Sequence, residues 1–158
     1  LNEREWEFFR ARRSSHNTTL AIRPGAGTGD ITDEALLWSY EKAVPVISSP
    51  LLYEGLVYTV KDGGILTALD AETGKVVKQG RVEGAVDKFY SSPIAAGGRI
   101  YLVSEGGTAS VIEPGPDWTL LSSTELGESC YATPAVAGDT LYLRTAGHLY
   151  AFGPGEAE

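Results

Sequence analysis

The sequence has one cysteine (Cys130), no methionine, and no apolar run long enough to cross a membrane as a helix. A single cysteine excludes an internal disulfide, and no CxxC metal-binding spacing is present. Basic residues are also few. The 13 Lys and Arg are outnumbered by 21 Asp and Glu, so the formal net charge is −8. This balance argues against nucleic-acid binding, which needs a basic surface to displace counterions from phosphates. It argues equally against attraction to an anionic membrane surface.

The residues that are abundant favour short strands and tight turns. The chain has 158 residues, of which 42% are hydrophobic and 19 are glycine. This length and apolar content allow one domain with a real core. High glycine, with many serine, threonine and tyrosine residues, is typical of strands joined by close turns.

A repeat of just over forty residues is the clearest pattern in the sequence. A hydroxyl residue precedes a proline three times, at spacings of 43 and 41 residues: Ser49-Pro50, Ser92-Pro93 and Thr133-Pro134. A tyrosine follows each proline by eight positions: Tyr58, Tyr101 and Tyr142. Glycine-bearing turns lie before and after each tyrosine, and an apolar segment follows the second turn. We interpret each copy as a four-stranded antiparallel meander, which is the size and strand count of a propeller blade.

We therefore predict an all-β fold: a partial β-propeller of about three to four four-stranded antiparallel blades, with a short N-terminal helix. A β-sandwich is the alternative, although sandwiches do not repeat their turns at a fixed period. A glycine-rich loop is expected from Pro24 to Asp33. The predicted division is a helical segment 1–17, a partial blade 18–41, blades 44–80 and 86–124, an incomplete blade 130–153 and a tail 154–158.

The segment Ala68-Leu69-Asp70-Ala71-Glu72-Thr73-Gly74-Lys75 resembles the repeat of pyrroloquinoline-quinone (quinoprotein) dehydrogenase propellers, Ala-x-Asp-x-x-Thr-Gly-x-x-x-Trp. In that family the tryptophan packs between neighbouring blades. Trp38 keeps the ring, whereas Lys78 takes the position in the next copy and Leu121 is expected to take it in the one after. The resemblance covers roughly residues 18–153, and it implies that blade docking here uses other side chains in places.

The resembled group contains both enzymes and cofactor-free propellers, such as the outer-membrane assembly lipoprotein of bacteria. The enzymes use a vicinal cysteine pair, a tryptophan and a carboxylate-rich calcium site, and none of these can be assigned here. We therefore expect a non-catalytic propeller module for protein–protein or small-ligand recognition, with no cofactor. The resemblance implies a periplasmic or otherwise extracytoplasmic location. The alternative is part of an oxidoreductase that uses pyrroloquinoline quinone with calcium.

Charged residues of the loops form the candidate site. In a meander, the loops that enter each first strand share a face with the loops that join the second and third strands. That face is expected to carry Lys42 and the candidate ligand or partner contacts Lys61, Asp62, Asp87, Lys88, Glu105 and Glu128. The competing interpretation is an ordinary solvated loop surface.

Other conspicuous residues are interpreted structurally. Cys130 has no flanking basic residue to lower its pKa and is expected to be buried. His148 has no second histidine nearby, and the recurring tyrosines are expected to pack within blades. Asp70 and Thr73 suit a local turn. The run Gly25–Gly29 lacks the lysine and the following helix of a phosphate loop.

About three and a half blades would leave open apolar faces at both ends. We therefore expect a piece of a longer propeller, whose remaining blades cover those faces, or self-association into a homo-oligomer.

Overall fold

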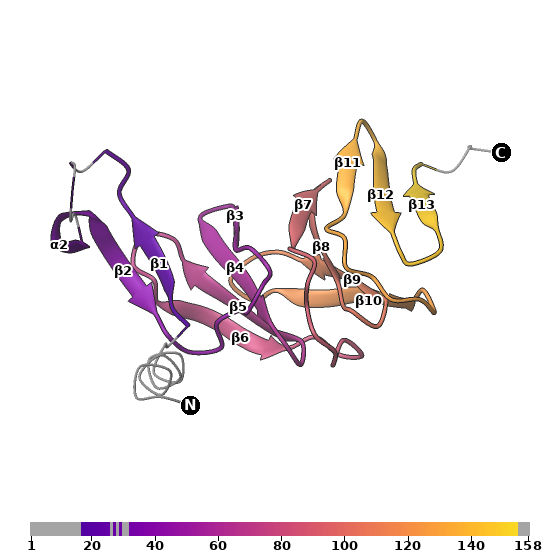
Figure 1. Cartoon of the computed structure of the whole chain (residues 1–158), viewed down its shortest axis with the longest axis horizontal. Helices are drawn as coiled ribbons and strands as arrows, with labels where there is room; N and C mark the ends of the chain where they lie inside the picture. The colour runs from indigo at the N-terminus through magenta and orange to yellow at the C-terminus, as the bar shows by residue number, and fades with distance from the viewer. Residues whose placement is uncertain (1–16, 26, 28, 30–31, 155–158) are drawn as a thin grey trace, which may run out of the picture.

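The computed structural model describes residues 17–25, 27, 29 and 32–154. These residues form four antiparallel sheets that follow one another along the long axis of the molecule (Figure 1). The all-β prediction is confirmed. The helix predicted near the N-terminus lies outside the described residues.

The first sheet has two strands, β1 (Thr19–Ile22) and β2 (Leu36–Tyr40), which pair antiparallel. A four-residue helix, α2 (Thr32–Ala35), leads directly into β2. The segment predicted as a loop from Pro24 to Asp33 therefore ends inside a short helical turn. Arg23 N donates a hydrogen bond to Ala35 O at 2.8 Å, which closes this connection.

The second and third sheets have four strands each, and the fourth sheet has three. The second sheet contains β3 (Leu51–Tyr53), β4 (Leu56–Lys61), β5 (Ile65–Asp70) and β6 (Val76–Arg81). The third contains β7 (Ile94–Ala96), β8 (Arg99–Val103), β9 (Thr108–Glu113) and β10 (Thr119–Glu125). The fourth contains β11 (Ala135–Ala137), β12 (Thr140–Arg144) and β13 (Leu149–Phe152). Every strand pairs only with its neighbours in sequence, as a meander requires.

The hydroxyl residue before each proline joins neighbouring sheets. Ser49 N donates to Ser92 Oγ at 2.8 Å, and Ser92 N donates to Thr133 Oγ1 at 2.9 Å. These residues enter the first strands β3, β7 and β11. The repeated hydroxyl is therefore a link from one sheet to the next, and its spacing sets the period seen in the sequence.

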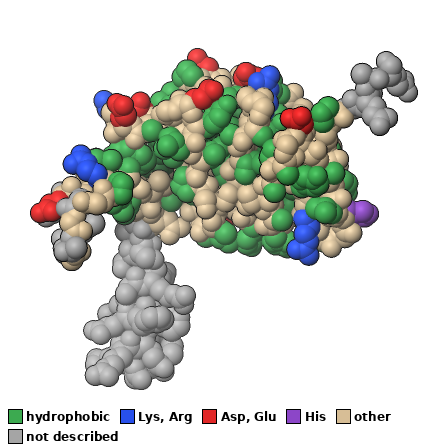
Figure 2. All heavy atoms as spheres, turned by 90° about the horizontal axis from the view of Figure 1, so that it is seen from above, with side chains coloured by type: hydrophobic (Ala, Val, Ile, Leu, Met, Phe, Trp, Pro, Cys, Tyr) green, Lys and Arg blue, Asp and Glu red, His purple; other side chains and the backbone are tan. Residues whose placement is uncertain are grey.

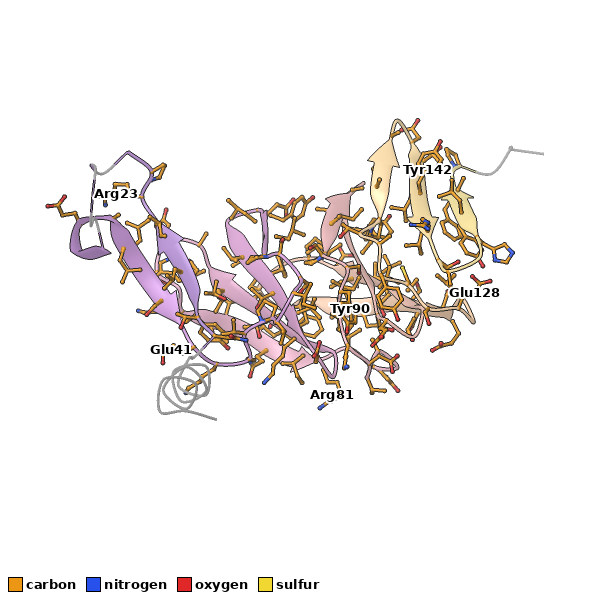
Figure 3. The ribbon with its side chains drawn as sticks, in the orientation of Figure 1. Arg23, Glu41, Arg81, Tyr90, Glu128 and Tyr142 are labelled. Carbon is orange, nitrogen blue, oxygen red and sulfur yellow. The ribbon has the colours of Figure 1, made fainter. Side chains whose placement is uncertain are left out.

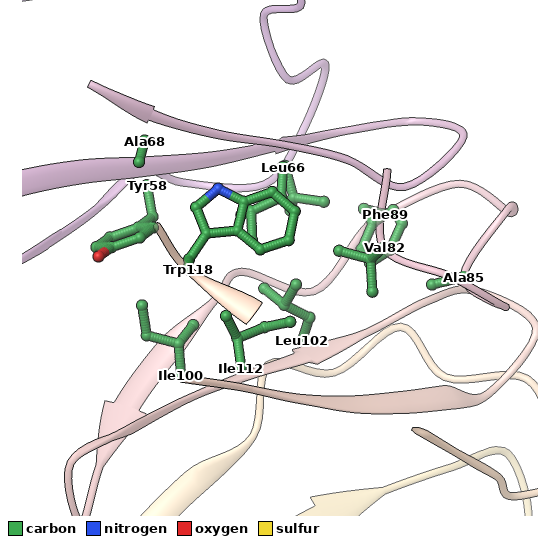
Figure 4. Close-up of a cluster of buried hydrophobic side chains, with 11 residues drawn as sticks. Tyr58, Leu66, Ala68, Val82, Ala85, Phe89, Ile100, Leu102, Ile112 and Trp118 are labelled. Carbon is green, nitrogen blue, oxygen red and sulfur yellow. The ribbon is translucent and has the colours of Figure 1, made fainter. Parts of the chain in front are cut away.

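The main core lies between the second and third sheets. Tyr58 and Leu66 come from the second sheet, and they pack against Ile100, Leu102 and Ile112 of the third (Figure 4). Val60 of the second sheet belongs to the same cluster. Trp118 lies in the middle of this cluster and is 5% exposed. Alternation along β4, β5, β8 and β9 directs these side chains into the space between the sheets.

The first joint, between the first and second sheets, uses the tryptophan that the family resemblance implied. Trp38 Nε1 donates to Ala71 O at 2.9 Å. Its ring lies against Gly74, where a Cβ atom would collide with the indole. Ala71 and Gly74 belong to the turn that follows Asp70. In the first joint, therefore, a tryptophan ring of the first sheet packs against a glycine in a turn of the second sheet.

The second joint, between the second and third sheets, is built differently. Lys78 pairs with Ala68 in the second sheet, just as Trp38 pairs with Ala21 in the first. Lys78 therefore occupies the docking position, which is the position that Trp38 holds in the first joint. Its Nζ donates to Trp118 O at 2.8 Å and lies 4.9 Å from the centroid of the Trp118 ring. Gly80 also lies against this ring, since a Cβ atom built there would come within 3.2 Å of the indole, which is closer than an ordinary contact. The tryptophan of this joint thus comes from the third sheet rather than the second.

The residue spacing of the repeat predicted that Leu121 occupies the docking position of the third sheet, and this prediction was wrong. Ser122 pairs with Val111, the partner equivalent to Ala68, while Leu121 falls in the irregular step between Leu120 and Ser122. The proline–glycine insertion before β10 shifts the register by one residue. Ser122 is exposed.

The third joint, between the third and fourth sheets, has a smaller buried cluster than the second. Its buried cluster consists of Val103, Cys130 and Leu143. Hydrophobic side chains also reach the surface over the two end sheets (Figure 2). Leu20 and Ile22 of the first sheet are more than half exposed, as is Leu149 of the fourth. Packing is therefore tightest in the middle of the described chain.

Candidate functional site

The connecting loops and the hairpins between second and third strands meet on one rim of the molecule. Gly63 N donates to Asp87 O at 2.9 Å, and Glu105 N donates to Lys88 O at 2.8 Å. One connecting loop therefore bonds to the hairpin of its own sheet and to that of the next sheet. The bond from Ala146 N to Ser129 O, at 2.9 Å, repeats the second contact one sheet further along. The expected shared face is confirmed by these bonds.

Three candidate carboxylates on this rim accept hydrogen bonds within the protein. Asp62 Oδ1 accepts from Phe89 N at 3.0 Å. Asp87 Oδ2 accepts from the Ser104 hydroxyl at 3.2 Å. Glu105 Oε1 accepts from the Tyr131 hydroxyl at 3.1 Å. Each of these bonds joins a hairpin to a connecting loop, so the carboxylates hold the rim together.

Glu128 is the most heavily bonded of the candidates and lies at the end of the fourth sheet away from Tyr142 (Figure 3). Its Oε2 accepts from the Thr145 hydroxyl at 2.7 Å and from Gly147 N at 2.9 Å. Its Oε1 lies 2.5 Å from His148 Nδ1. The hydroxyl bond, with help from the Gly147 amide, holds the pKa of Glu128 below its ordinary value. Glu128 fixes the loop before β11 to the hairpin of the fourth sheet.

This geometry gives a pH prediction. Because the folded-state pKa of Glu128 is lowered, its ionised form stabilises the fold above the ordinary carboxyl pKa of 4.5. That contribution is lost as the pH falls through the lowered value. We expect Glu128→Gln to lower the urea midpoint at neutral pH and to weaken the dependence of that midpoint on pH below 4.5. Glu83→Gln, at an exposed connecting-loop residue, should leave the midpoint at neutral pH unchanged. An unchanged acid profile in Glu128→Gln would contradict this assignment.

The candidate lysines have a different surrounding from the carboxylates. Lys61, Lys88 and Lys42 are exposed, and their ammonium groups form no ion pair with another described residue. Lys61 ends β4, while Lys88 lies in the connecting loop two residues before Tyr90. The rim thus presents lysines outward and directs its carboxylates toward its own loops.

An apolar row crosses the same loops. Ile47, Tyr90 and Tyr131 each lie two residues before the hydroxyl that links the sheets, and we name them the rim row. Ile47 is 57% exposed and Tyr131 is 58% exposed. The rings of Tyr90 and Tyr131 are 5.2 Å apart at an angle of 55°. The register of the repeat was sufficient to find this row, but the sequence prediction considered only the charged residues.

The remaining conspicuous residues have structural contacts. Tyr58 is buried, its hydroxyl accepts from Gly115 N at 2.7 Å, and burial raises its pKa. Cys130 is buried as expected, its Sγ contacts Arg144 O at 3.3 Å, and burial raises the pKa of the thiol. Asp70 Oδ1 accepts from the Thr73 amide and hydroxyl at 2.8 and 2.7 Å, which confirms the predicted turn.

No group of three or more His, Cys, Asp or Glu side chains among the described residues is placed to hold a metal ion. No described helix has the length and apolar character to span a bilayer.

Comparison with known proteins places the repeat in a family context. The family described as "Outer membrane protein assembly factor BamB" matches residues 6–156. No protein of curated function matches the sequence. Among solved structures, BamB from Moraxella catarrhalis superposes with a TM-score of 0.63 at 19% identity, over 76% of this chain and 37% of that one.

A quinohemoprotein alcohol dehydrogenase from Pseudomonas putida HK5 superposes with a TM-score of 0.59 at 15% identity. The match covers 72% of this chain and 20% of the dehydrogenase. At these identities the two structures show the fold alone, which is that of a quinoprotein-repeat β-propeller. The chain spans well under half the length of either protein.

Proposed function

The chain belongs to the family described as outer membrane protein assembly factor BamB, and from that premise we propose that it is a non-catalytic module of the bacterial cell envelope that recognises another protein. The partner we propose is a component of outer-membrane protein assembly, the process named in the family description. The recognition surface is the rim row together with Lys61 and Lys88.

The observation that carries this proposal is the exposure of Ile47 and Tyr131 at equivalent positions, on the loops that enter the second and fourth sheets. Ser49 bonds to Ser92 in the same way as Ser92 bonds to Thr133. The rim-row residue two positions before each of these hydroxyls is therefore repeated from one sheet to the next. Aromatic side chains are enriched in the centres of protein interfaces, where charged residues are depleted and form the edge. A tyrosine-containing row edged by lysines has this composition.

The rigidity of the rim supports the same use. Carboxylates that bond to hairpins and loops on both sides fix the backbone from which the row projects. A surface that is held before binding loses less conformational freedom on association. The inward direction of Asp62, Asp87 and Glu105 therefore supports binding by keeping the row in place rather than by contacting the partner.

Site-specific photo-crosslinking tests this assignment. A photo-crosslinking residue at position 131, in the protein expressed in its own bacterium, should give one defined adduct with an outer-membrane assembly protein. The matched control is position 72, because the turn that carries Glu72 joins β5 to β6 at the opposite rim and is exposed. The change Ile47→Asp should lower the yield from position 131 by about tenfold or more, as loss of a central apolar contact does.

The result that would contradict the proposal is equal crosslinking from positions 131 and 72, or a yield unaffected by Ile47→Asp. The rival hypothesis, a quinone-dependent oxidoreductase, predicts dye-linked alcohol oxidation and an absorbance change when pyrroloquinoline quinone and calcium are added to the protein. Activity of that kind would replace the recognition hypothesis.

A further inference from the structure

The third sheet has a free outer edge in the middle of the described chain. β10 is the last strand of that sheet, and no described strand pairs with its outer side. With seven residues it is the longest described strand, and six of them are exposed. The second and fourth sheets lie on either side of the third (Figure 1), so this edge does not arise where the described residues begin or end.

The backbone at the end of β10 directs polar groups away from the sheet. Leu126 N donates to Gly107 O at 3.0 Å, one residue after β10 ends. Residues of an antiparallel strand bond alternately toward one neighbour and the other. Ser123 and Glu125 therefore direct their N–H and C=O groups toward the outer side of the sheet, where an added strand could pair with them.

The corresponding edge of the second sheet is protected by charge, whereas the edge of β10 is not. Edge strands commonly contain lysine, other charged residues or proline, which prevent pairing with another chain. β6 contains Lys78 and Arg81. β10 contains no Lys, Arg, Pro or Gly, and its one charged residue is Glu125 at the end. Both strands have an irregular step near their start, so that step does not account for the difference.

Carboxylates mark the two ends of this edge. Asp117 is exposed just before β10, and Glu125 is exposed at its last residue. Glu125 Oε1 accepts from the Thr108 hydroxyl at 3.0 Å, which holds this carboxylate at the end of the strand. Lys78 lies near the first end, but its ammonium group already donates to Trp118 O. A strand that pairs with β10 therefore meets negative charge at both ends.

This charge pattern disfavours a second copy of the chain as the occupant. Two β10 strands paired antiparallel about Leu121 would place Asp117 of each copy opposite Glu125 of the other. Like charges that face each other across a strand pair are destabilising. A strand with basic residues at both ends would form opposite-charge pairs at the same two places.

From these features we propose that β10 is a docking edge for an extended segment of a partner protein. The segment adds a strand antiparallel to β10, with hydroxyl or β-branched residues along its length and a lysine or arginine at each end. Its backbone pairs with Ser123 and Glu125, and its basic side chains meet Asp117 and Glu125. In strand addition of this kind, main-chain hydrogen bonds supply affinity and side chains supply specificity.

This edge shares no residue with the rim row, Lys61 or Lys88. Binding at β10 is therefore independent of crosslinking from position 131, and either surface can fail its test without the other.

Synthetic peptides test the edge directly. A fluorescent peptide, Lys-Thr-Val-Thr-Val-Thr-Val-Thr-Lys, should bind the 158-residue protein saturably in fluorescence anisotropy. The same peptide with glutamate in place of both lysines should bind about fivefold more weakly or worse, because two favourable charge pairs become unfavourable. A peptide N-methylated at every internal residue keeps the side chains but has no amide donors there, and it should not bind.

Hydrogen exchange identifies the strand that is covered. The amides of Ser123 and Glu125 should exchange more slowly when the lysine peptide is bound, because pairing protects them from solvent. Val82 N donates to Gly64 O as Leu126 N donates to Gly107 O, so Gln79 is the outward residue of β6 that corresponds to Ser123. Exchange at Gln79 should stay unchanged.

Charge reversal in the protein locates the ends of the segment. Glu125→Lys should weaken binding of the lysine peptide and strengthen binding of the glutamate peptide, each by about threefold or more. Asp117→Lys, which lies outside the strand, should act in the same direction. Glu72→Lys makes the same charge change in the exposed turn between β5 and β6 and should leave the preference unchanged.

Four outcomes would overturn the proposal: no saturable binding, equal affinity of the lysine and glutamate peptides, binding of the N-methylated peptide, or unchanged exchange at Ser123 and Glu125. A dimer of the protein that protects the same two amides would assign the edge to a second copy and would also overturn it.

Discussion

Replacing Trp118 by alanine should lower the free energy of unfolding by about 3–5 kcal/mol, the range observed for large aromatic residues in cores. The ring is 5% exposed and lies between two sheets, so its loss leaves a cavity that neither sheet can close without moving. The side chain also covers Gly80 and receives Lys78 over its face. Urea unfolding followed by circular dichroism would measure the effect.

Leu121→Ala is the matched control, because Leu121 lies three residues further along and is 48% exposed. Its effect should stay within about 0.5 kcal/mol. A cost for Trp118→Ala no larger than that of the control would show that the second joint does not depend on the ring.

Lys78 provides a finer test of the same joint. A double-mutant cycle between Lys78→Ala and Trp118→Ala should give a coupling energy of about 0.5–2 kcal/mol, the range for a cation over an indole face. The hydrogen bond from Lys78 Nζ goes to the backbone oxygen of residue 118 and survives the tryptophan substitution. The coupling therefore reports on the ring contact.

Strand positions were the part of the fold that the sequence predicted best. Tyr58, Tyr101 and Tyr142 occur in second strands, at β4, β8 and β12, because the turns on either side contain glycine at a fixed distance. Turn spacing of this kind is local, so it can be read from the chain without knowledge of packing.

Docking between sheets was predicted less well. The sequence showed that Lys78 replaces the family tryptophan, but it did not show that Trp118 fills the joint from the opposite side. Trp118 lies just after an insertion, where alignment by motif loses register. Which side of a joint supplies the ring depends on backbone geometry across two sheets, which no local pattern records.

The candidate site divides in the same way. The strand order of a meander decides at which rim each loop lies, so the rim location of Asp62, Asp87 and Glu105 could be predicted. Their hydrogen bonds to Phe89 N, the Ser104 hydroxyl and the Tyr131 hydroxyl connect different loops and could not. A charged loop residue has the same appearance in sequence whether its carboxylate faces solvent or a neighbouring amide.

Gly64→Ala should be among the most damaging single substitutions, with an expected loss above about 4 kcal/mol, a size that requires a specific structural cause. Gly64 is buried, and a Cβ atom there would overlap the backbone oxygen of Ala85. Its own oxygen accepts from Val82 N at 2.8 Å, so this residue ties the second-sheet hairpin to the loop leaving β6. Backbone on both sides of the collision is held by hydrogen bonds and cannot move away cheaply.

Gly55→Ala separates that collision from the cost of backbone conformation. Gly55 has a φ of +76° and Gly64 has +71°, but nothing lies within 4 Å of a Cβ atom built on Gly55. The left-handed backbone conformation alone should lower the free energy of unfolding of Gly55→Ala by about 1–2 kcal/mol. The difference between the two variants, measured by thermal and urea unfolding, is then the cost of pushing the connecting loop off the hairpin. Equal losses would mean that φ alone limits position 64 and that the loop can yield. Since that loop carries Asp87, Lys88 and Tyr90, a large difference would also show that the surface proposed for recognition is held by the backbone beneath it.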